Sequence, residues 1–325
     1  MNLQTQRPDL SSLPDSFAID CNNISAISIA GDEADTYLQG QVTCDMNKLS
    51  DKGLLVGAHC DAKGKMFAAF RVINHFGQRL LIQSKASIAA SMAQLQKYGV
   101  FAKVDIKQSD ELAFLTLVGE QGVALIEQQF GKVPDSFNPV VQHQQTSIIY
   151  LAGDLPRYLI VATEQTIADL QAQSELPKFD GQLWAALEIQ SGFVHLNEAA
   201  VGEYVPQMVN LQCVNGISFS KGCYMGQETV ARMKYLGKNK RALFRLQGQT
   251  ELALTIANDT LIEVQLGDNW RRGGNILAHY QADSGALEIQ AVLASDTPDD
   301  AVLRLKDNPE VTLTIAPLPY SLNEH

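Results

Sequence analysis

The 325-residue sequence has few cysteines, and their spacing fits none of the usual structural uses of cysteine. Their number is odd, no Cys-x-x-Cys pair occurs, and no histidine stands at zinc-finger spacing. The five are Cys21, Cys44, Cys60, Cys213 and Cys223. These absences argue against a disulfide framework, a structural zinc site and a self-contained iron–sulfur site. We therefore predict reduced thiols and no metal site.

Long hydrophobic runs are also missing. No stretch of about 18 uncharged apolar residues occurs, and residues 1–16 lack the basic-then-apolar pattern of a signal peptide. We expect a cytoplasmic protein that makes no membrane contact. The motifs GxxxxGK[ST], GxGxxG, HExxH and GxSxG are absent as well. Nucleotide hydrolysis, dinucleotide redox chemistry, zinc proteolysis and α/β-hydrolase chemistry are therefore disfavoured.

Positive charge is scarce, with 25 lysines and arginines against 36 acids and a net charge of −11. Phosphate contacts require cations, so we expect no direct DNA binding. Residues 221–241 depart from this balance, because they hold six cations and only one acid, Glu228. The cations are Lys221, Arg232, Lys234, Lys238, Lys240 and Arg241. A basic segment in an acidic chain predicts a focused anion site, and a solvated helix end is the alternative.

The hydrophobic pattern predicts an α+β fold. Apolar runs typical of strands alternate with segments of helical period, in a βαββ-like order typical of split ferredoxin-like sandwiches. The expected strands are 54–62, 66–75, 79–84, 102–108, 113–119, 147–153 and 157–163. The expected helices are 86–99, 120–131, 163–173, 180–193 and 227–235. After residue 241, short apolar runs between turns predict a small antiparallel barrel.

The stretch SFSKGCYMGQETVARMKY, residues 218–235, contains the most distinctive thiol. Cys223 stands between Gly222 and Gly226, just before a predicted helix. A helix N-terminus and the nearby Lys221 favour a thiolate, so Cys223 is a candidate nucleophile. The need for a small side chain in a tight turn explains a cysteine at position 223 equally well. No histidine is adjacent, so His59 or His195 would have to approach through the fold to act as its base.

Two tryptophans could stack on a flat heterocycle. Trp184 falls in the predicted helix 180–193, for which Asp180 is the expected N-cap, and core packing is its other explanation. Trp270 precedes Arg271 and Arg272 in an expected turn, where guanidinium groups could meet a carboxylate or phosphate.

The segment KGCYMGQETVARMK closely resembles the K-G-C-Y-x-G-Q-E signature of YgfZ-type proteins. These are folate-binding, tRNA-modifying relatives of the glycine-cleavage T protein, an aminomethyltransferase. The resemblance extends from about residue 25 to the C-terminus through the blocks YLQGQVTCD (37–45), AHCDAKGKM (58–66), GISFSKGCY (216–224), NKRAL, NWRR and IAPLPYSL.

This resemblance implies a three-domain ring of the aminomethyltransferase type. Its parts would be two ferredoxin-like α+β portions and a C-terminal antiparallel β-barrel. The expected division is a discontinuous folate-binding domain of residues 1–48 and 111–238 that carries KGCYMGQE, a ferredoxin-like domain of residues 49–110, and a barrel of residues 239–325.

The resemblance also implies tetrahydrofolate, or a one-carbon derivative, bound near the centre of the ring. It implies support of iron–sulfur enzymes, including a tRNA-thiolating enzyme, hence an indirect link to tRNA, and a regulatory link to DnaA and replication initiation. The signature transfers to Lys221, Gly222, Cys223, Tyr224, Gly226, Gln227 and Glu228. Cys223 would be the functional thiol. Trp184 matches the folate-contacting tryptophan, whereas Ile24 occupies the place of a second, missing tryptophan.

Two other functions stay open at this point. The chain could be an enzyme that carries out folate-dependent one-carbon transfer or demethylation, with Cys223 in its active site. It could instead be an RNA-binding protein that uses the basic segment, although the acidic remainder disfavours this.

Overall fold

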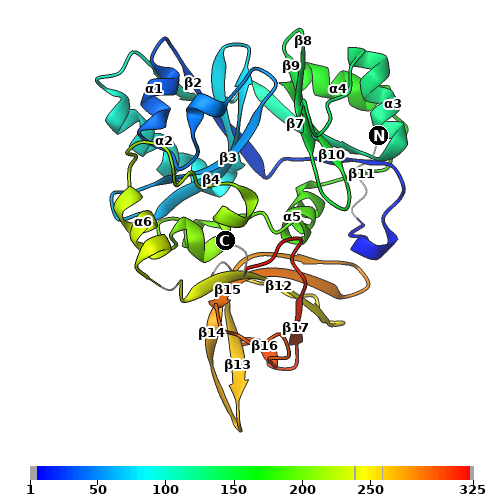
Figure 1. Ribbon diagram of the computed structural model, residues 1–325. Helices are drawn as coiled ribbons and strands as arrows, with labels where there is room; N and C mark the ends of the chain where they lie inside the picture. The colour runs from blue at the N-terminus through cyan, green and yellow to red at the C-terminus, as the bar shows by residue number, and fades with distance from the viewer. Residues whose placement is uncertain (1–5, 238, 258, 323–325) are drawn as a thin grey trace.

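The computed structural model describes residues 6–237, 239–257 and 259–322, which form an α+β fold in three parts (Figure 1). Two β-sheets lie side by side, and a closed barrel lies beneath them in this view. The predicted α+β class and the C-terminal antiparallel barrel are both confirmed. Lys238, one of the six cations of the basic segment, lies outside the described residues.

The first part is a six-stranded sheet with strand order β11-β1-β7-β10-β9-β8. β11 pairs in parallel with β1, and the other pairs are antiparallel. Its strands are β1 (Phe17–Asp20), β7 (Leu112–Val118), β8 (Val140–His143), β9 (Thr146–Leu151), β10 (Arg157–Thr163) and β11 (Lys178–Phe179). The helices of this segment are α3 (Gly119–Phe130), α4 (Glu164–Ala172) and α5 (Gly181–Gln190). Gly131 ends α3 in the left-handed conformation, φ 72°, a common helix C-terminus.

The second part is a five-stranded sheet with order β3-β4-β5-β2-β6. Its strands are β2 (Ile24–Ala30), β3 (Leu54–Cys60), β4 (Met66–His75), β5 (Gln78–Ser84) and β6 (Asp105–Gln108), and its helices are α1 (Ala34–Gln39) and α2 (Lys85–Gly99). The expected domain division groups residues 24–30 with 111–238, but the structure differs, because β2 hydrogen-bonds to β5 and β6. An apolar run indicates a strand without specifying its partner, so this pairing could not be read from the chain.

The barrel closes in the order β12-β15-β14-β13-β16-β17. Its strands are β12 (Arg241–Gln249), β13 (Leu261–Leu266), β14 (Asn269–Gln281), β15 (Ala286–Ala294), β16 (Leu303–Leu305) and β17 (Thr312–Ala316). Between α5 and the barrel the chain forms short 3-10 turns and then α6 (Gln227–Tyr235). Trp270, expected in a turn, instead lies in β14 and pairs with Gln265 of β13.

Helix α5 occupies the middle of the molecule (Figure 1). It packs against β1 of the six-stranded sheet and against β14 and β15 of the barrel. Eight of its ten residues are buried, including Trp184 and Glu188. Asp180 is its N-cap as predicted, because its side chain accepts a hydrogen bond from the Gln182 amide. A helix buried on every side can hold charged groups only with partners, which directs attention to Glu188.

Candidate functional site

The KGCYMGQE segment lies against the chain around residues 40–44. The Met225 amide donates to the Gly40 carbonyl at 3.0 Å, and the Ser218 amide donates to the Thr43 carbonyl at 2.9 Å. Thr43 Oγ1 in turn donates to the Gly216 carbonyl at 2.6 Å and accepts from the Ala58 amide at 2.8 Å. Three sequence blocks, 37–45, 58–66 and 216–224, therefore meet at one place.

Gly226 and Gly64 pack backbone against backbone, which fixes the start of α6 on the turn between β3 and β4. Both have positive φ, 82° and 77°. A Cβ atom on Gly226 would lie 2.6 Å from the Asp61 carbonyl oxygen and 2.7 Å from Gly64 Cα. Gly222, by contrast, has open space around the position of a Cβ. The two glycines that flank Cys223 thus have different physical roles.

Lys221 is buried, and its ammonium group is bound by backbone carbonyls. Nζ donates to Val42 O at 2.8 Å and to Cys44 O at 2.7 Å, and it lies 5.2 Å from the centroid of the Tyr224 ring. Burial lowers the pKa of Lys221 to about 8, although Asp45 opposes this effect. Lys221 therefore attaches the motif to the 42–44 segment.

Cys223 is the one exposed thiol among the five cysteines, all of which lie in the described chain. Burial raises the pKa of Cys21 and of Cys44 to about 12, and it raises the pKa of Cys60 further. Within the described residues, no hydrogen bond joins Cys223 to a histidine. His59 is buried against Ser91, with Nδ1 3.0 Å from Oγ, and burial lowers its pKa to about 4.

The other members of the motif surround Cys223 in different environments. Tyr224 is buried in a hydrophobic cluster with Phe193 and Leu277 of the barrel, and burial raises its pKa. Glu228 is exposed and forms an ion pair at 3.3 Å with Arg232, one helical turn further on. Gln227 begins α6 and its amide donates to Tyr224 O.

A buried cluster of two arginines and one glutamate joins the two sheets through α5. Arg71 of β4 donates to both carboxylate oxygens of Glu188, at 2.6 and 3.1 Å. Arg157 of β10 reaches the same carboxylate, with Nη1 2.8 Å from Oε1. This contact is an ion pair, and Nη1 has no partner in good hydrogen-bond geometry. Two buried cations thus share one anion.

The electrostatics of this cluster follow from that imbalance. Burial opposes ionisation of Glu188, but the two guanidinium groups outweigh it and lower the pKa of the carboxyl. Burial also lowers the pKa of Arg157, and Arg71 adds to this effect while Glu188 opposes it. One positive charge is left without a compensating anion within the cluster.

Trp184 lies under the second arginine. Arg157 Cζ is 4.8 Å from the centroid of the indole, and Arg71 Cζ is 5.9 Å from it. The indole is only 1% exposed, and its Nε1 is buried without a hydrogen-bond partner. Ile24 belongs to the same hydrophobic cluster as Trp184, and Asn23 beside it donates to Gly181 O at the start of α5. Both predicted positions thus belong to one hydrophobic cluster.

A pocket of about 300 Å³ opens beside this cluster. Arg157 lines it together with α5 and the C-terminal segment. Further lining residues are Asp154, Leu187, Gln190, Cys213 and Tyr320. Arg157 therefore connects the pocket to Glu188 and Trp184.

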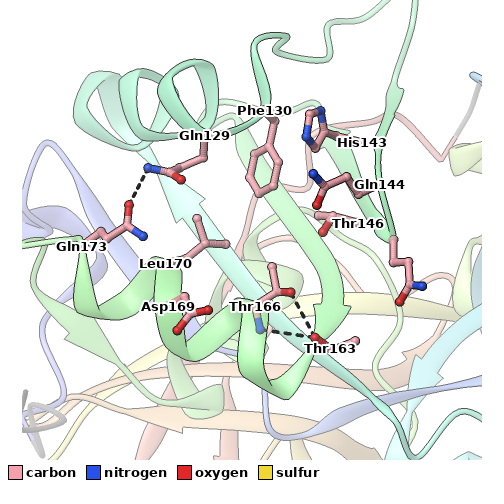
Figure 2. A pocket seen from close by; sticks show the side chains of 11 residues that line it. Gln129, Phe130, His143, Gln144, Thr146, Thr163, Thr166, Asp169, Leu170 and Gln173 are labelled. Atoms are coloured by element: carbon pink, nitrogen blue, oxygen red, sulfur yellow. Dashed lines mark hydrogen bonds between the residues drawn. The ribbon is translucent and has the colours of Figure 1, made fainter.

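A second pocket, of about 510 Å³, lies on the far side of the six-stranded sheet, between α3, α4 and the β8–β9 hairpin (Figure 2). Its wall consists of neutral amides and hydroxyls with Phe130 and His143, and Gln129 donates to Gln173 across one end. Its only charged group is the carboxylate of Asp169, since no lysine or arginine is among its lining residues. A ligand that carries carboxylates therefore suits the smaller pocket better.

Sequence reasoning did not find Arg71, Arg157 or Glu188. The available signal was a single charge inside an apolar run: MFAAFRVINH, RYLIVAT and WAALEIQ. Such isolated charges are almost never fully buried unless they are paired. Their pairing across two sheets could not be read from the chain.

Within residues 6–237, 239–257 and 259–322, no group of three or more histidine, cysteine or acidic side chains is arranged to hold a metal ion. No helix in the same residues combines the length and apolar character needed to span a bilayer.

Comparisons with known proteins agree on one family and one fold. The model of the YgfZ β-barrel domain matches residues 239–308. The chain is 52% identical over 317 residues to the tRNA-modifying protein YgfZ of Colwellia psychrerythraea, covering 98% of this chain and 97% of the relative. The protein of the same description from Klebsiella pneumoniae is 40% identical over 301 residues, covering 91% and 90%.

Among solved structures, the glycine cleavage system aminomethyltransferase T from Bartonella henselae is similar in fold, with a TM-score of 0.73. The alignment covers 96% of this chain and 88% of that one at 13% identity. The expected aminomethyltransferase-type architecture is thereby confirmed.

Proposed function

Because the chain belongs to the YgfZ family of tRNA-modifying proteins, we propose that it binds a reduced folate, tetrahydrofolate or a one-carbon derivative, beside Arg157 and Trp184. In this proposal the folate-bound protein supports iron–sulfur enzymes in the cytoplasm, among them a tRNA-thiolating enzyme, and so affects tRNA modification indirectly. A regulatory link to DnaA and replication initiation belongs to the same proposal.

The observation that carries the proposal is the surplus cation of the arginine cluster. A purely structural ion pair needs one arginine for Glu188, and Arg71 already fills that role with two hydrogen bonds. Adding the buried Arg157 costs several kcal/mol of desolvation unless another anion compensates it. The unpaired Nε1 of Trp184 adds about 1–3 kcal/mol. An anionic ligand in the adjoining pocket would offset the cost of Arg157.

Folate fits these groups in charge and hydrogen bonding, since it carries carboxylates and polar ring atoms. Arg157 is at the pocket wall and would bind a carboxylate or a ring oxygen. Gln190, also at the wall, can both donate and accept hydrogen bonds. Trp184 lies behind Arg157, so it would hold that guanidinium in position. When bound, a reduced folate supplies a carrier for a one-carbon unit.

Cys223 would be the functional thiol, because it is exposed next to a segment that three sequence blocks hold in place. Lys221, Gly222, Tyr224, Gly226, Gln227 and Glu228 would then form its surroundings. The alternative function is one-carbon transfer or demethylation with Cys223 in the active site. Transfer of a one-carbon unit from a methyl or aminomethyl donor to tetrahydrofolate, lost in Cys223→Ala, would establish that alternative.

Calorimetric titration with tetrahydrofolate tests the folate site. Arg157→Gln should weaken binding at least about tenfold, since a charge-assisted hydrogen bond contributes about 1.5–3 kcal/mol. Arg304→Gln is a matched control, because Arg304 also pairs with a glutamate, Glu263, and lies 3.9 Å over the other tryptophan.

The fold of each variant is checked by its thermal midpoint, and Arg157→Lys replaces Arg157→Gln if the latter does not fold. Equal affinity of wild type and a folded Arg157 variant would remove Arg157 from the site. Absence of any binding would remove the folate proposal.

A further inference from the structure

Cations gather on one surface of this acidic protein. We call it the α6 surface: it comprises the exposed side of α6, the turn 63–65 between β3 and β4, and the adjoining edge of the barrel. Its cations are Lys63, Lys65, Arg232, Lys234, Lys240, Arg241 and Arg272. In Figure 1, α6 lies at the margin of the molecule, between the five-stranded sheet and the start of β12.

Direct contacts show that these segments are neighbours. A Cβ atom on Gly64 would lie 3.0 Å from Thr229 Cβ, so the turn touches α6. The Met66 amide donates to Tyr204 O at 2.8 Å. Gln207 joins α6 to the start of β12, because its side chain donates to Val230 O at 2.6 Å and its carbonyl accepts from the Asn239 side chain at 2.7 Å. The turn, α6 and the barrel edge therefore form one continuous face.

The positive charge of this face is poorly compensated. Its acids are Asp61, Glu203 and Glu228, together with Glu263, which pairs with Arg272 across two strands, and Asp296, next to Ser295, whose amide donates to Lys240 O. The seven cations therefore outnumber the acids. Of the seven cations of this face, Arg232 alone forms an ion pair within the described residues, with Glu228, while Lys65 Nζ donates to the backbone carbonyl of Glu203. Asp61 Oδ1 is occupied by the amides of Lys63 and Lys65.

Apolar side chains stand exposed within the same face. Tyr235 is 65% exposed and Leu236 is 83% exposed. Lys234 Nζ lies 3.7 Å from the centroid of Phe219 and 5.8 Å from that of Tyr235, so the ammonium covers Phe219 and leaves the phenol open. Cations around an open aromatic ring are the combination that binds phosphates and stacks on unpaired bases.

We propose that the α6 surface binds RNA that presents unpaired bases. The cations would contact phosphates and Tyr235 would stack on a base. Duplex DNA offers no free base face to this phenol, and an acidic peptide offers no flat ring to it. The negative charge of the rest of the chain would repel phosphate and confine binding to this surface. Direct contact with RNA goes beyond the indirect link to tRNA proposed above, and RNA binding at this surface does not require folate.

Fluorescence anisotropy with a labelled RNA stem-loop tests the proposal on the full chain. If about four phosphates are neutralised, affinity should fall roughly 100-fold between about 50 and 200 mM salt. Lys234→Ala with Lys240→Ala should weaken binding and reduce the salt slope by about two. Tyr235→Ala should weaken binding about tenfold with the slope unchanged. Lys97→Ala with Lys107→Ala, two exposed lysines on α2 and β6, is the matched control and should change nothing.

Several results would overturn the proposal. One is the absence of saturable RNA binding at about 50 mM salt. Another is an RNA affinity of the Lys234 and Lys240 double variant equal to that of wild type. Competition by polyglutamate as strong as by RNA would identify an acidic protein as the partner instead. Duplex DNA bound as tightly, with no effect of Tyr235→Ala, would exclude base stacking. Tetrahydrofolate titration of the same variants should match wild type, which separates failure here from failure of the folate proposal.

Discussion

At the scale of single residues, the loop that carries Cys223 is held in place by contacts with distant parts of the chain. The sequence places a lysine beside the thiol, and this favours a thiolate interpretation. The structure shows that the ammonium of Lys221 is held by the carbonyls of Val42 and Cys44. On the other side of Cys223, the close approach of Gly226 to Gly64 holds the end of the loop against the turn between β3 and β4. The motif shows which residues surround Cys223, but its contact with a turn about 160 residues earlier in the chain becomes visible only in the folded structure.

Gly226→Ala should therefore be much more harmful than Gly222→Ala. The alanine at 226 combines a positive φ with a backbone clash, so we expect a loss of about 1–3 kcal/mol in the free energy of unfolding. At 222 a methyl group meets open space, and the change should stay within about 0.5 kcal/mol. Urea denaturation measures both.

The same variants can be compared by alkylation of Cys223, followed by mass spectrometry. Displacement of the loop in Gly226→Ala should alter the rate, whereas Gly222→Ala should react like wild type. Equal stability of the two variants would contradict the role assigned to the Gly226–Gly64 contact.

At the scale of secondary-structure elements, the positions of strands and helices follow from hydrophobic period, whereas their partners do not. The predicted helix 180–193 corresponds to α5, including its Asp180 cap. The predicted strands 54–62 and 66–75 correspond to β3 and β4, which pair antiparallel. Strands β1 and β2 follow one another closely in the chain but enter different sheets, and no local pattern separates them. His59 likewise looks like a possible base in sequence, yet β3 buries it against α2.

The burial of His59 predicts an acid-sensitive fold. Its pKa is about 4 in the folded protein and about 6.5 when exposed. Between these values the unfolded chain binds a proton that the folded chain does not. Titration of His59 therefore leaves the free energy of unfolding unchanged above about pH 6.5. Toward pH 4 it lowers that free energy by up to about 3 kcal/mol.

Urea denaturation of His59→Gln at several pH values checks this effect. The decline in the free energy of unfolding between about pH 6.5 and 4 should be shallower than in wild type. His143→Gln, which replaces a histidine of β8, is the control. A decline as steep in His59→Gln as in wild type would show that other groups cause the acid sensitivity.

At the scale of the whole molecule, three features meet around α5: the two sheets, the barrel and the arginine cluster. The resemblance of the sequence to one family predicted the architecture, and similarity in fold to an aminomethyltransferase confirms it. It also directed attention to Trp184 as a ligand contact. The structure places that indole in the core at 1% exposure, beneath Arg157. Because Arg71, Arg157 and Glu188 come from three separate elements, their meeting could not be predicted from local sequence.

The burial of Trp184 also decides how it should be tested. Trp184→Ala would leave a large cavity and cost about 3–5 kcal/mol, so a loss of binding in that variant would not separate contact from unfolding. The intrinsic fluorescence of Trp184 avoids the problem. The chain has only two tryptophans, so Trp270→Phe leaves Trp184 as the sole indole.

Folate binding beside Arg157 and Trp184 is therefore tested most directly by titrating Trp270→Phe with tetrahydrofolate and following the fluorescence emission of Trp184. We predict saturable quenching with the same dissociation constant that calorimetry gives, and its loss in the Trp270→Phe, Arg157→Gln double variant. Heat of binding without any change in Trp184 emission would place the folate elsewhere in the molecule. No binding by either method would contradict the proposal that this protein is a folate-binding protein.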